Sequence, residues 1–134
     1  MKIASIINGA ESIDSSGETM EVRNPYSGEL VAEMQLAGEK EMEEAIENSL
    51  QTFHKTMKTM PVHERSDILR RASDLLEEKQ EEFAEIIAME AGKPIKHSRA
   101  EIKRSIQVIR FSSELSKHME GEVLPMDAGL RGEN

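Results

Sequence analysis

The histidines are the residues whose type most readily supports metal binding or proton transfer, and the chain has four: His54, His63, His97 and His118. None forms a compact ligand pair such as H-E-x-x-H, which places two imidazoles on one face of a helix. His63-Glu64 begins that motif, but the second histidine is missing four residues after the first. We therefore interpret the histidines as scattered surface residues and predict no metal-binding residue.

Phosphate binding would need glycines packed into a strand-to-helix turn, so that backbone N–H groups can approach a pyrophosphate. The eight glycines of the chain are scattered, and neither G-x-G-x-x-G nor G-x-x-x-x-G-K-[ST] occurs. Gly92-Lys93 comes nearest to such a loop. It is better explained as a helix end, because Gly92 can adopt a left-handed conformation and Pro94 blocks continuation. We predict no cofactor-binding residue.

Acidic residues are numerous, and Glu77, Glu78, Glu81 and Glu82 form the densest group. Their spacing suits a solvated helix surface paired with Lys79 or Arg71, whereas an acid/base pair needs two environments that separate its pKa values. The chain has no cysteine, which excludes a disulfide scaffold, a thiolate metal site and a cysteine nucleophile. We predict no catalytic residue.

Composition narrows the class of protein. A chain of 134 residues with 37% hydrophobic and 32% charged residues is typical of one helix-rich globular domain. The net charge of −9 argues against nucleic acid and anionic membranes as partners. The N-terminal apolar stretch is too short for a signal peptide, and no segment approaches about 18 apolar residues. The expected location is cytoplasmic.

Residues 1–36 are predicted to form short strands and turns, including an antiparallel hairpin. Ile3 to Ile7 favours a strand, and Asn8-Gly9 is a strong tight-turn signal. Residues 19–23 alternate in polarity, and N-P-Y-S-G at 24–28 supplies turn residues before a return strand at 30–36. We interpret this segment as a β appendage to the helical region that begins at Glu39.

Residues 39–119 are predicted to be helical. Apolar residues recur at helical spacing in each expected segment, and Thr56 to Met60 is expected to be a connector that leads to Pro61 in a first helical turn. A bend is expected near Lys79-Gln80. The apolar faces comprise Met42, Ala45, Ile46, Leu50 and Phe53; Ile68, Leu69, Ala72, Leu75 and Leu76; Phe83, Ile86 and Ile87; and Ile102, Ile106 and Ile109.

The start of the last helix has two interpretations. Ser98-x-x-Glu101 could form a capping box that begins it late, or Pro94 could lie in its first turn, which we favour. The helix is expected to run to about Met119. A short strand is expected near 121–125, and the remaining residues contain no closing element, so the sequence reads as an interrupted domain.

The methionines also allow two interpretations. Met42, Met57, Met60 and Met89 could form an adaptable binding surface, because thioethers fill irregular contacts. More often such residues fill a core, and we favour that interpretation.

Several motifs, in their order along the chain, resemble the N-terminal segment of NAD(P)-dependent aldehyde dehydrogenases over nearly the whole sequence. One departure is Thr56, near a place where that family often has tryptophan. The tail from Leu124 to Arg131 is similar to members that act on small hydroxy- or phospho-aldehydes and semialdehydes, with a lean toward a lactaldehyde-dehydrogenase-like branch. The motifs are Ile7-Asn8-Gly9, N-P-Y-S-G-E at 24–29, P-V-H-E-R at 61–65, I-L-R-R-A at 68–72, E-A-G-K-P at 90–94, R-A-E-I at 99–102, Arg110-Phe111 and G-E-V-L-P at 121–125.

The resemblance implies that this is an α+β fragment, mainly α-helical, of an α/β Rossmann-like parent. Residues 1–134 would be an incomplete N-terminal part of the dinucleotide-binding domain. The family oxidises an aldehyde to a carboxylic acid with NAD(P)⁺, using a cysteine nucleophile and a glutamate that lie downstream of the matched segment. The cofactor, NAD or NADP, would bind the full-length parent, and none is expected on this chain alone.

The resemblance also implies partners. They are the remainder of the parent polypeptide, the aldehyde substrate and further copies in a homo-oligomer, without nucleic acid or membrane. The alternative is a non-catalytic module that self-associates or binds a protein through its helices, because large uncovered apolar faces are rare in monomers. Both hypotheses predict that this chain alone oxidises no aldehyde.

Overall fold

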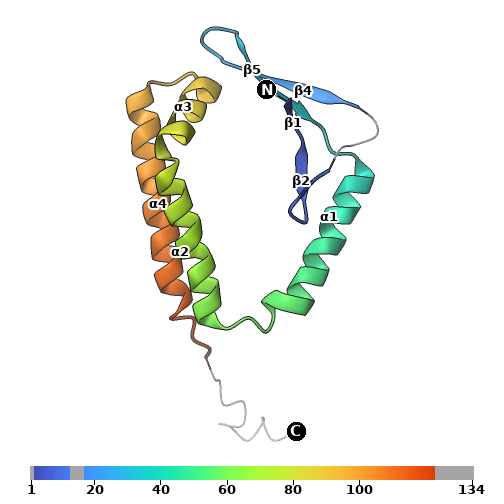
Figure 1. The fold of residues 1–134 in the computed structure, drawn as a ribbon, viewed down its shortest axis with the longest axis vertical. Helices are drawn as coiled ribbons and strands as arrows, with labels where there is room; N and C mark the ends of the chain where they lie inside the picture. Colours follow the sequence, from blue (N-terminus) through green and yellow to red (C-terminus); the bar gives the residue numbers. More distant parts are fainter. Residues whose placement is uncertain (1, 13–16, 123–134) are drawn as a thin grey trace, which may run out of the picture.

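The computed structural model describes residues 2–12 and 17–122, with the strands first and the helices after them (Figure 1). This order confirms the predicted α+β, mainly helical class. The elements are β1 (Lys2–Ile3), β2 (Ser5–Ile7), β3 (Ala10–Ser12), β4 (Thr19–Arg23), β5 (Leu30–Gln35), α1 (Glu39–Thr52), the π-helical turn η1 (Phe53–Met57), α2 (Val62–Glu78), α3 (Gln80–Ala91) and α4 (Ile95–Ser116).

The larger sheet has the strand order β1-β5-β4. β4 and β5 form the predicted antiparallel hairpin, in which Val22 lies opposite Ala32. β1 pairs with β5 in parallel, an arrangement that the sequence analysis did not predict. The predicted single strand from Ile3 to Ile7 is wrong in one respect, because the chain leaves this sheet at Ala4 and β2 pairs with β3 instead.

The β2–β3 hairpin has the predicted two-residue turn. Asn8 has a φ of 51° and Gly9 a φ of 78°, and two positive φ values are what a type I′ turn requires. Ile7 lies opposite Ala10 across the turn.

The start of α1 is capped by the side chain of Glu41. The Gly38 N–H donates to the Glu41 carboxylate at 3.1 Å, which satisfies one otherwise free amide at the helix start. The helix continues through η1, so Thr56 and Met57, which were predicted to lie in a connector, are still helical. The connection to α2 is therefore shorter than predicted.

The helical region confirms the predicted break between α2 and α3, which falls at Lys79. α4 begins at Ile95 after the N-cap Pro94, so the late start at Ser98 is wrong. It ends at Ser116 rather than near Met119. Gly121 and Glu122 belong to no helix or strand, and the rest of the expected strand at 121–125 lies outside the described residues.

The core is small and lies between α2, α3 and α4. Ala84, Ile102 and Ile106 are buried, and Leu76, Ile87 and Ile95 pack against them. Where α2 meets α4, the buried residues are largely serines, namely Ser66, Ser73, Ser98 and Ser113. Such small side chains allow the two helices to approach closely, but they bury little apolar surface.

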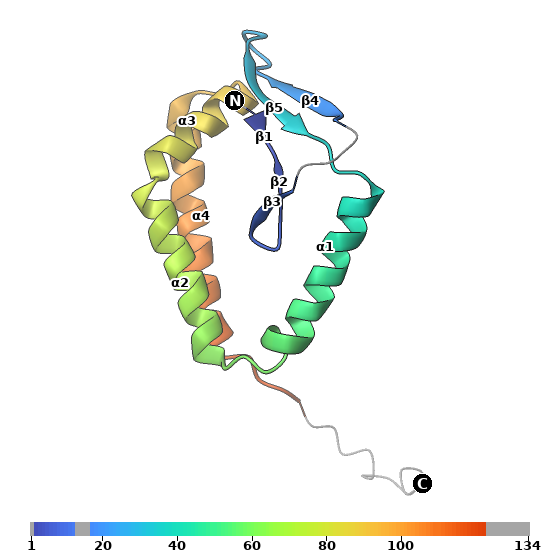
Figure 2. The same ribbon diagram turned by 45° about the vertical axis from the view of Figure 1, so that its right-hand side comes forward.

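α1 lies apart from the α2–α3–α4 group, and the two meet near the connector after η1 (Figures 1 and 2). The larger sheet joins them at the opposite end, and the β2–β3 hairpin lies between them, against α1. The chain thus has a helical core on one side only.

Candidate interaction surface

The four histidines are exposed and stand on separate segments: His54 in η1, His63 in α2, His97 in α4 and His118 just after α4. Among residues 2–12 and 17–122, no three histidine or carboxylate side chains lie close enough to hold a metal ion. The structure brings none of the sequence candidates together as a metal centre.

Gly92 ends α3 with a φ of 60°, which confirms the helix-end interpretation of Gly92-Lys93. The glycine has a second role that the sequence did not reveal. A Cβ atom at this position would lie 2.8 Å from Cγ of Pro25 and 3.3 Å from the backbone nitrogen of Tyr26. The end of α3 is therefore packed directly on the loop at 24–28.

Several hydrogen bonds close that loop. The side-chain oxygen of Asn24 accepts the N–H groups of Tyr26 at 2.9 Å and Ser27 at 3.1 Å. The Gly28 N–H donates to the Asn24 carbonyl at 2.8 Å, and the Arg23 guanidinium donates to the Gly28 carbonyl at 2.9 Å. The motifs N-P-Y-S-G and E-A-G-K-P are far apart in the sequence, and they pack against each other where the larger sheet meets the helices.

The glutamate cluster pairs mainly with α4. Glu77 contacts Arg110 and Glu81 contacts Arg99, while Glu82 lies 4.0 Å from Lys79. The expected pairing with Lys79 is confirmed at Glu82, whereas among the described residues the arginines paired with this cluster are Arg99 and Arg110 of α4 in place of Arg71.

Two ion pairs, Arg99–Glu81 and Lys93–Glu101, favour the charged form of the carboxylate. The hydrogen bond from Arg99 lowers the pKa of Glu81, and the hydrogen bond from Lys93 lowers the pKa of Glu101. A general acid at neutral pH needs a pKa shifted the opposite way. These residues are therefore suited to holding helices together.

The most unusual feature of the described residues is their exposed apolar surface. On α1 and the first residue of η1, the exposed fractions of Met42, Ile46, Leu50 and Phe53 are 51% to 61%. On α4, those of Val108, Phe111 and Leu115 are 55% to 67%. These side chains recur every three or four residues, so each set forms a continuous line along its helix.

Several core predictions are wrong for the same reason. Met42, Met57 and Met89 are exposed, as are Ile68 and Leu75 of α2. The contacts between the helices bury four serines, Ala84, Ile102 and Ile106, and the exposed larger side chains lie outside these contacts. Sequence periodicity identified apolar faces, but it could not indicate that nothing among the described residues covers them.

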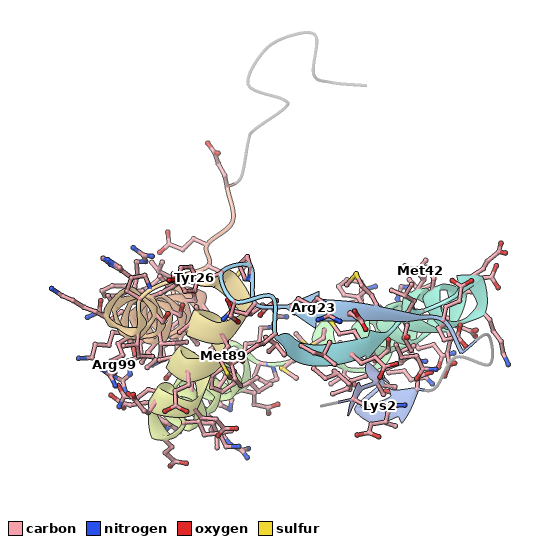
Figure 3. The ribbon with its side chains drawn as sticks, turned by 90° about the horizontal axis from the view of Figure 1, so that it is seen from above. Lys2, Arg23, Tyr26, Met42, Met89 and Arg99 are labelled. Atoms are coloured by element: carbon pink, nitrogen blue, oxygen red, sulfur yellow. The ribbon has the colours of Figure 1, made fainter. Side chains whose placement is uncertain are left out.

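A groove of about 330 Å³ separates the larger sheet from α3. Figure 3 shows Met89 on the side of α3 nearest the strands. Among the described residues, Glu90 is the only charged one that lines the groove, and the other lining residues are Ile3, Val22, Val31, Ala32, Met34, Ile86 and Met89. The sheet and α3 are thus incompletely packed against each other beyond the Gly92–Pro25 contact.

Comparison with known proteins identifies the family. The model of the aldehyde dehydrogenase family matches residues 12–133, which is most of the chain. This chain belongs to the aldehyde dehydrogenase family. The assignment confirms the resemblance carried by the ordered motifs.

Individual aldehyde dehydrogenases match at moderate identity. The chain is 37% identical over 113 residues to a lactaldehyde dehydrogenase of Methanocaldococcus jannaschii, covering 84% of this chain and 24% of the relative. The crystal structure of aldehyde dehydrogenase 21 from Physcomitrella patens, in complex with succinate, matches with a TM-score of 0.84 and 29% identity, over 98% of this chain and 27% of that one. An NADP-dependent glyceraldehyde-3-phosphate dehydrogenase from Bacillus halodurans, complexed with NADP, matches with a TM-score of 0.85 and 28% identity. The match covers 97% of this chain and 27% of that one.

The chain spans about a quarter of the length of these aldehyde dehydrogenases. The helix starts among its described residues carry charges that do not suit a pyrophosphate. The first turns of α1, α2 and α3 carry Glu39, Glu41, Glu64, Glu81 and Glu82, whose charges oppose a pyrophosphate. At the start of α4, the amine of Lys93 is already paired with Glu101.

The described helices were compared with the length and apolar character of a membrane-spanning helix. None of those between residues 17 and 122 combines the length and apolar character needed to cross a bilayer.

Proposed function

We propose that this chain is the N-terminal part of a longer NAD(P)-dependent aldehyde dehydrogenase and supplies helices that cover its dinucleotide-binding domain. Residues 39–119 form the helical cover, residues 1–36 form a β appendage, and residues 1–134 are an incomplete part of the domain. The chain contributes no catalytic, cofactor-binding or metal-binding residue. Oxidation of the aldehyde to a carboxylic acid belongs to the remainder of the parent polypeptide.

One observation carries this proposal. Lines of large apolar side chains on α1 and α4 are exposed, as are Ile68 and Leu75 of α2, while the core between the helices is small. Uncovered apolar surface of this extent is unusual in a soluble monomer. Burying such surface stabilises a protein by about 25 cal/mol per Å², so folded proteins usually cover it. Together with the one-quarter coverage of the relatives, it supports further polypeptide as the missing cover.

The remaining properties of the parent are proposed from the family. Its cofactor is NAD or NADP, and the match to an NADP complex supports a nicotinamide cofactor without choosing between the two. The similarity to a lactaldehyde dehydrogenase supports a small hydroxy-aldehyde or semialdehyde as substrate. We propose a cytoplasmic homo-oligomer that binds neither nucleic acid nor membrane.

Sequencing the reading frame that contains these codons tests the proposal. We expect further in-frame sequence with a strand, a P-[WF]-N-type loop and later a cysteine in a G-Q-x-C-type segment. A stop codon directly after Asn134 would contradict it. The protein encoded by the whole frame should form NAD(P)H from an aldehyde, whereas this chain alone should form none.

A second candidate function is self-association of the 134-residue chain, or binding of another protein, without catalysis. The observation that favours it is the presence of two separate apolar lines on one molecule, one on α1 and one on α4. The two candidates differ in what covers those lines, namely the same polypeptide or another molecule.

A further inference from the structure

Asn8-Gly9 is the only Asn-Gly pair of the sequence, and it forms the exposed two-residue turn of the β2–β3 hairpin. The side-chain amide of an asparagine can be attacked by the backbone nitrogen of the residue that follows it. Glycine allows this attack most readily, because it has no Cβ atom to hinder the approach. A Cβ atom at Gly9 would itself meet nothing within 4 Å, so the space around this residue is open.

The other two asparagines of the described residues lack these conditions. Asn24 precedes Pro25, whose ring nitrogen carries no hydrogen and cannot become a nucleophile. Asn48 precedes Ser49 inside α1, where helical hydrogen bonds hold the backbone N–H groups. The side-chain amide of Asn48 also donates to the Glu44 carbonyl at 3.0 Å. The chemistry therefore points to Asn8 alone.

The closed turn protects Asn8 from this attack. The φ values of 51° at Asn8 and 78° at Gly9 are those of a type I′ turn, in which ψ at the first turn residue is small and positive. To react, the Gly9 nitrogen and Cγ of Asn8 must join in a flat five-membered ring. The peptide between them must rotate away from the type I′ conformation to form that ring, so the reaction requires the hairpin to open.

The hairpin is built so that it opens easily. β2 and β3 have three residues each and form a two-stranded sheet separate from the larger one. Ile6 is 73% exposed, and Ala10 and Glu11 are exposed as well, so little apolar surface holds the strands together. Two-stranded hairpins are marginally stable on their own, and segments with few buried contacts open at low free energy.

We propose that Asn8 is a site of spontaneous deamidation that opening of the β2–β3 hairpin gates. The Gly9 nitrogen loses its proton and bonds to Cγ of Asn8, while the bond from Cγ to the side-chain nitrogen breaks and releases ammonia. One water then opens the resulting succinimide. Addition at the side-chain carbonyl gives aspartate, and addition at the main-chain carbonyl gives isoaspartate. No electron is transferred, and water is the only co-reactant.

The two products affect the hairpin differently. Asp-Gly is itself favoured in a type I′ turn, so aspartate keeps the hairpin and adds one negative charge. Isoaspartate inserts a methylene group into the main chain, and the turn that pairs Ile7 with Ala10 no longer fits. Because β2 packs on α1, and Asn8 lies beside Ala45 of α1, isoaspartate should loosen the hairpin from that helix (Figure 2). Hydrogen exchange at the Ala10 amide should rise in the isoaspartate fraction.

Peptide mapping by mass spectrometry, on the folded chain aged at mildly alkaline pH, tests the proposal. We expect aspartate and isoaspartate to accumulate at Asn8 and Asn24 to stay unchanged. Conversion at Asn48 should be slower on the order of tenfold or more, because a helix must open before the Ser49 nitrogen is free. The rate at Asn8 should rise with pH, because the Gly9 nitrogen must lose its proton.

The variant A10P tests the gate. Ala10 pairs with Ile7 directly after the turn, and proline there removes a backbone donor of that pair. We expect A10P to deamidate on the order of tenfold faster than the natural chain and to approach the rate of the free peptide of residues 2–12, because closure of such a hairpin is marginal. Circular dichroism should show unchanged helix content.

The control is E11P, which places proline one residue further along β3. Glu11 lies opposite Ile6 in a pair whose backbone N–H groups point away from the partner strand, since hydrogen-bonded and non-hydrogen-bonded pairs alternate. Proline is tolerated at such an edge position. We expect E11P to deamidate at Asn8 at nearly the natural rate, so a faster rate in A10P would be specific to loss of the ladder hydrogen bond.

Three outcomes would overturn the proposal: an Asn8 that stays unchanged in the folded chain while the free peptide converts, faster conversion at Asn48 than at Asn8, or equal rates in A10P and the natural chain. The inference goes beyond the proposed function and does not depend on it. The enzyme parent fails on a different result, a reading frame that stops after Asn134.

Discussion

Replacing Gly92 by alanine should destabilise the chain through two separate effects. The first is conformational, because Gly92 has a φ of 60° and a side chain in the left-handed region costs about 1 kcal/mol. The second is steric, because the new Cβ would lie 2.8 Å from Cγ of Pro25 and 3.3 Å from the backbone nitrogen of Tyr26. Neither neighbour is the end of a flexible side chain, so the 24–28 loop must move.

Gly28 provides a matched control. Its φ is 76°, yet a Cβ there would meet nothing within 4 Å. The variant G28A should therefore show the conformational cost alone, about 1 kcal/mol. G92A should add about 1–3 kcal/mol for the forced displacement of the loop, which is the usual cost of overpacking.

Urea unfolding of both variants, monitored by circular dichroism at low protein concentration, measures the difference. The double variant P25A/G92A removes the Cγ and Cδ atoms that the new Cβ would meet, so it should recover most of the steric part. Equal losses of unfolding free energy in G92A and G28A would refute the reasoning. So would a P25A/G92A variant in which the two losses simply add.

Three further predictions rest on the described contacts and exposures. Ser113 donates to the Ser66 carbonyl at 2.8 Å, and the two hydroxyls lie 2.9 Å apart. S113A should therefore lower the unfolding free energy by about 1–3 kcal/mol, and S66A/S113A should lose less than the sum of the two single variants in a urea double-mutant cycle. The Arg99 hydrogen bond lowers the pKa of Glu81 below its ordinary 4.5, so the pair stabilises the fold above about pH 4.5 and loses this contribution as the pH falls through the lowered pKa. The stability difference between the natural chain and R99Q, measured by urea unfolding, should shrink from pH 7 to pH 3, and a constant difference would contradict it. Ile46 is 61% exposed, so I46Q should change the unfolding free energy by less than about 0.5 kcal/mol yet reduce the fluorescence of a bound apolar dye, whereas a large loss of stability would place Ile46 in a core.

Local signals in the sequence predicted the local structure well. Asn8-Gly9 indicated the two-residue hairpin, Gly92 with Pro94 indicated the end of α3 and the start of α4, and Lys79 marks the predicted bend. Glycine permits a positive φ and proline fixes φ, so at these positions the residue type acts on the backbone directly and no distant partner is needed. The family assignment also came from the sequence, through the order of its motifs.

Contacts between distant segments could not be predicted in this way. The parallel pairing of β1 with β5, the packing of Gly92 on Pro25 and the partners of Glu77 and Glu81 all depend on how the elements are arranged. The buried serines between α2 and α4 are a further example, because periodicity marks apolar residues as the expected interior. The apolar face of α1 was identified correctly, but its exposure depends on which other segments lie against it in space.

The rate of NAD(P)H formation tests the central claim most directly. It should be measured for the purified 134-residue chain and for the protein encoded by the whole reading frame, with small hydroxy-aldehydes and semialdehydes and with both NAD⁺ and NADP⁺. We predict no rate above the protein-free blank for the chain and a clear rate for the longer protein. Aldehyde-dependent NAD(P)H formation by the chain alone would contradict the assignment of its helices to a structural role.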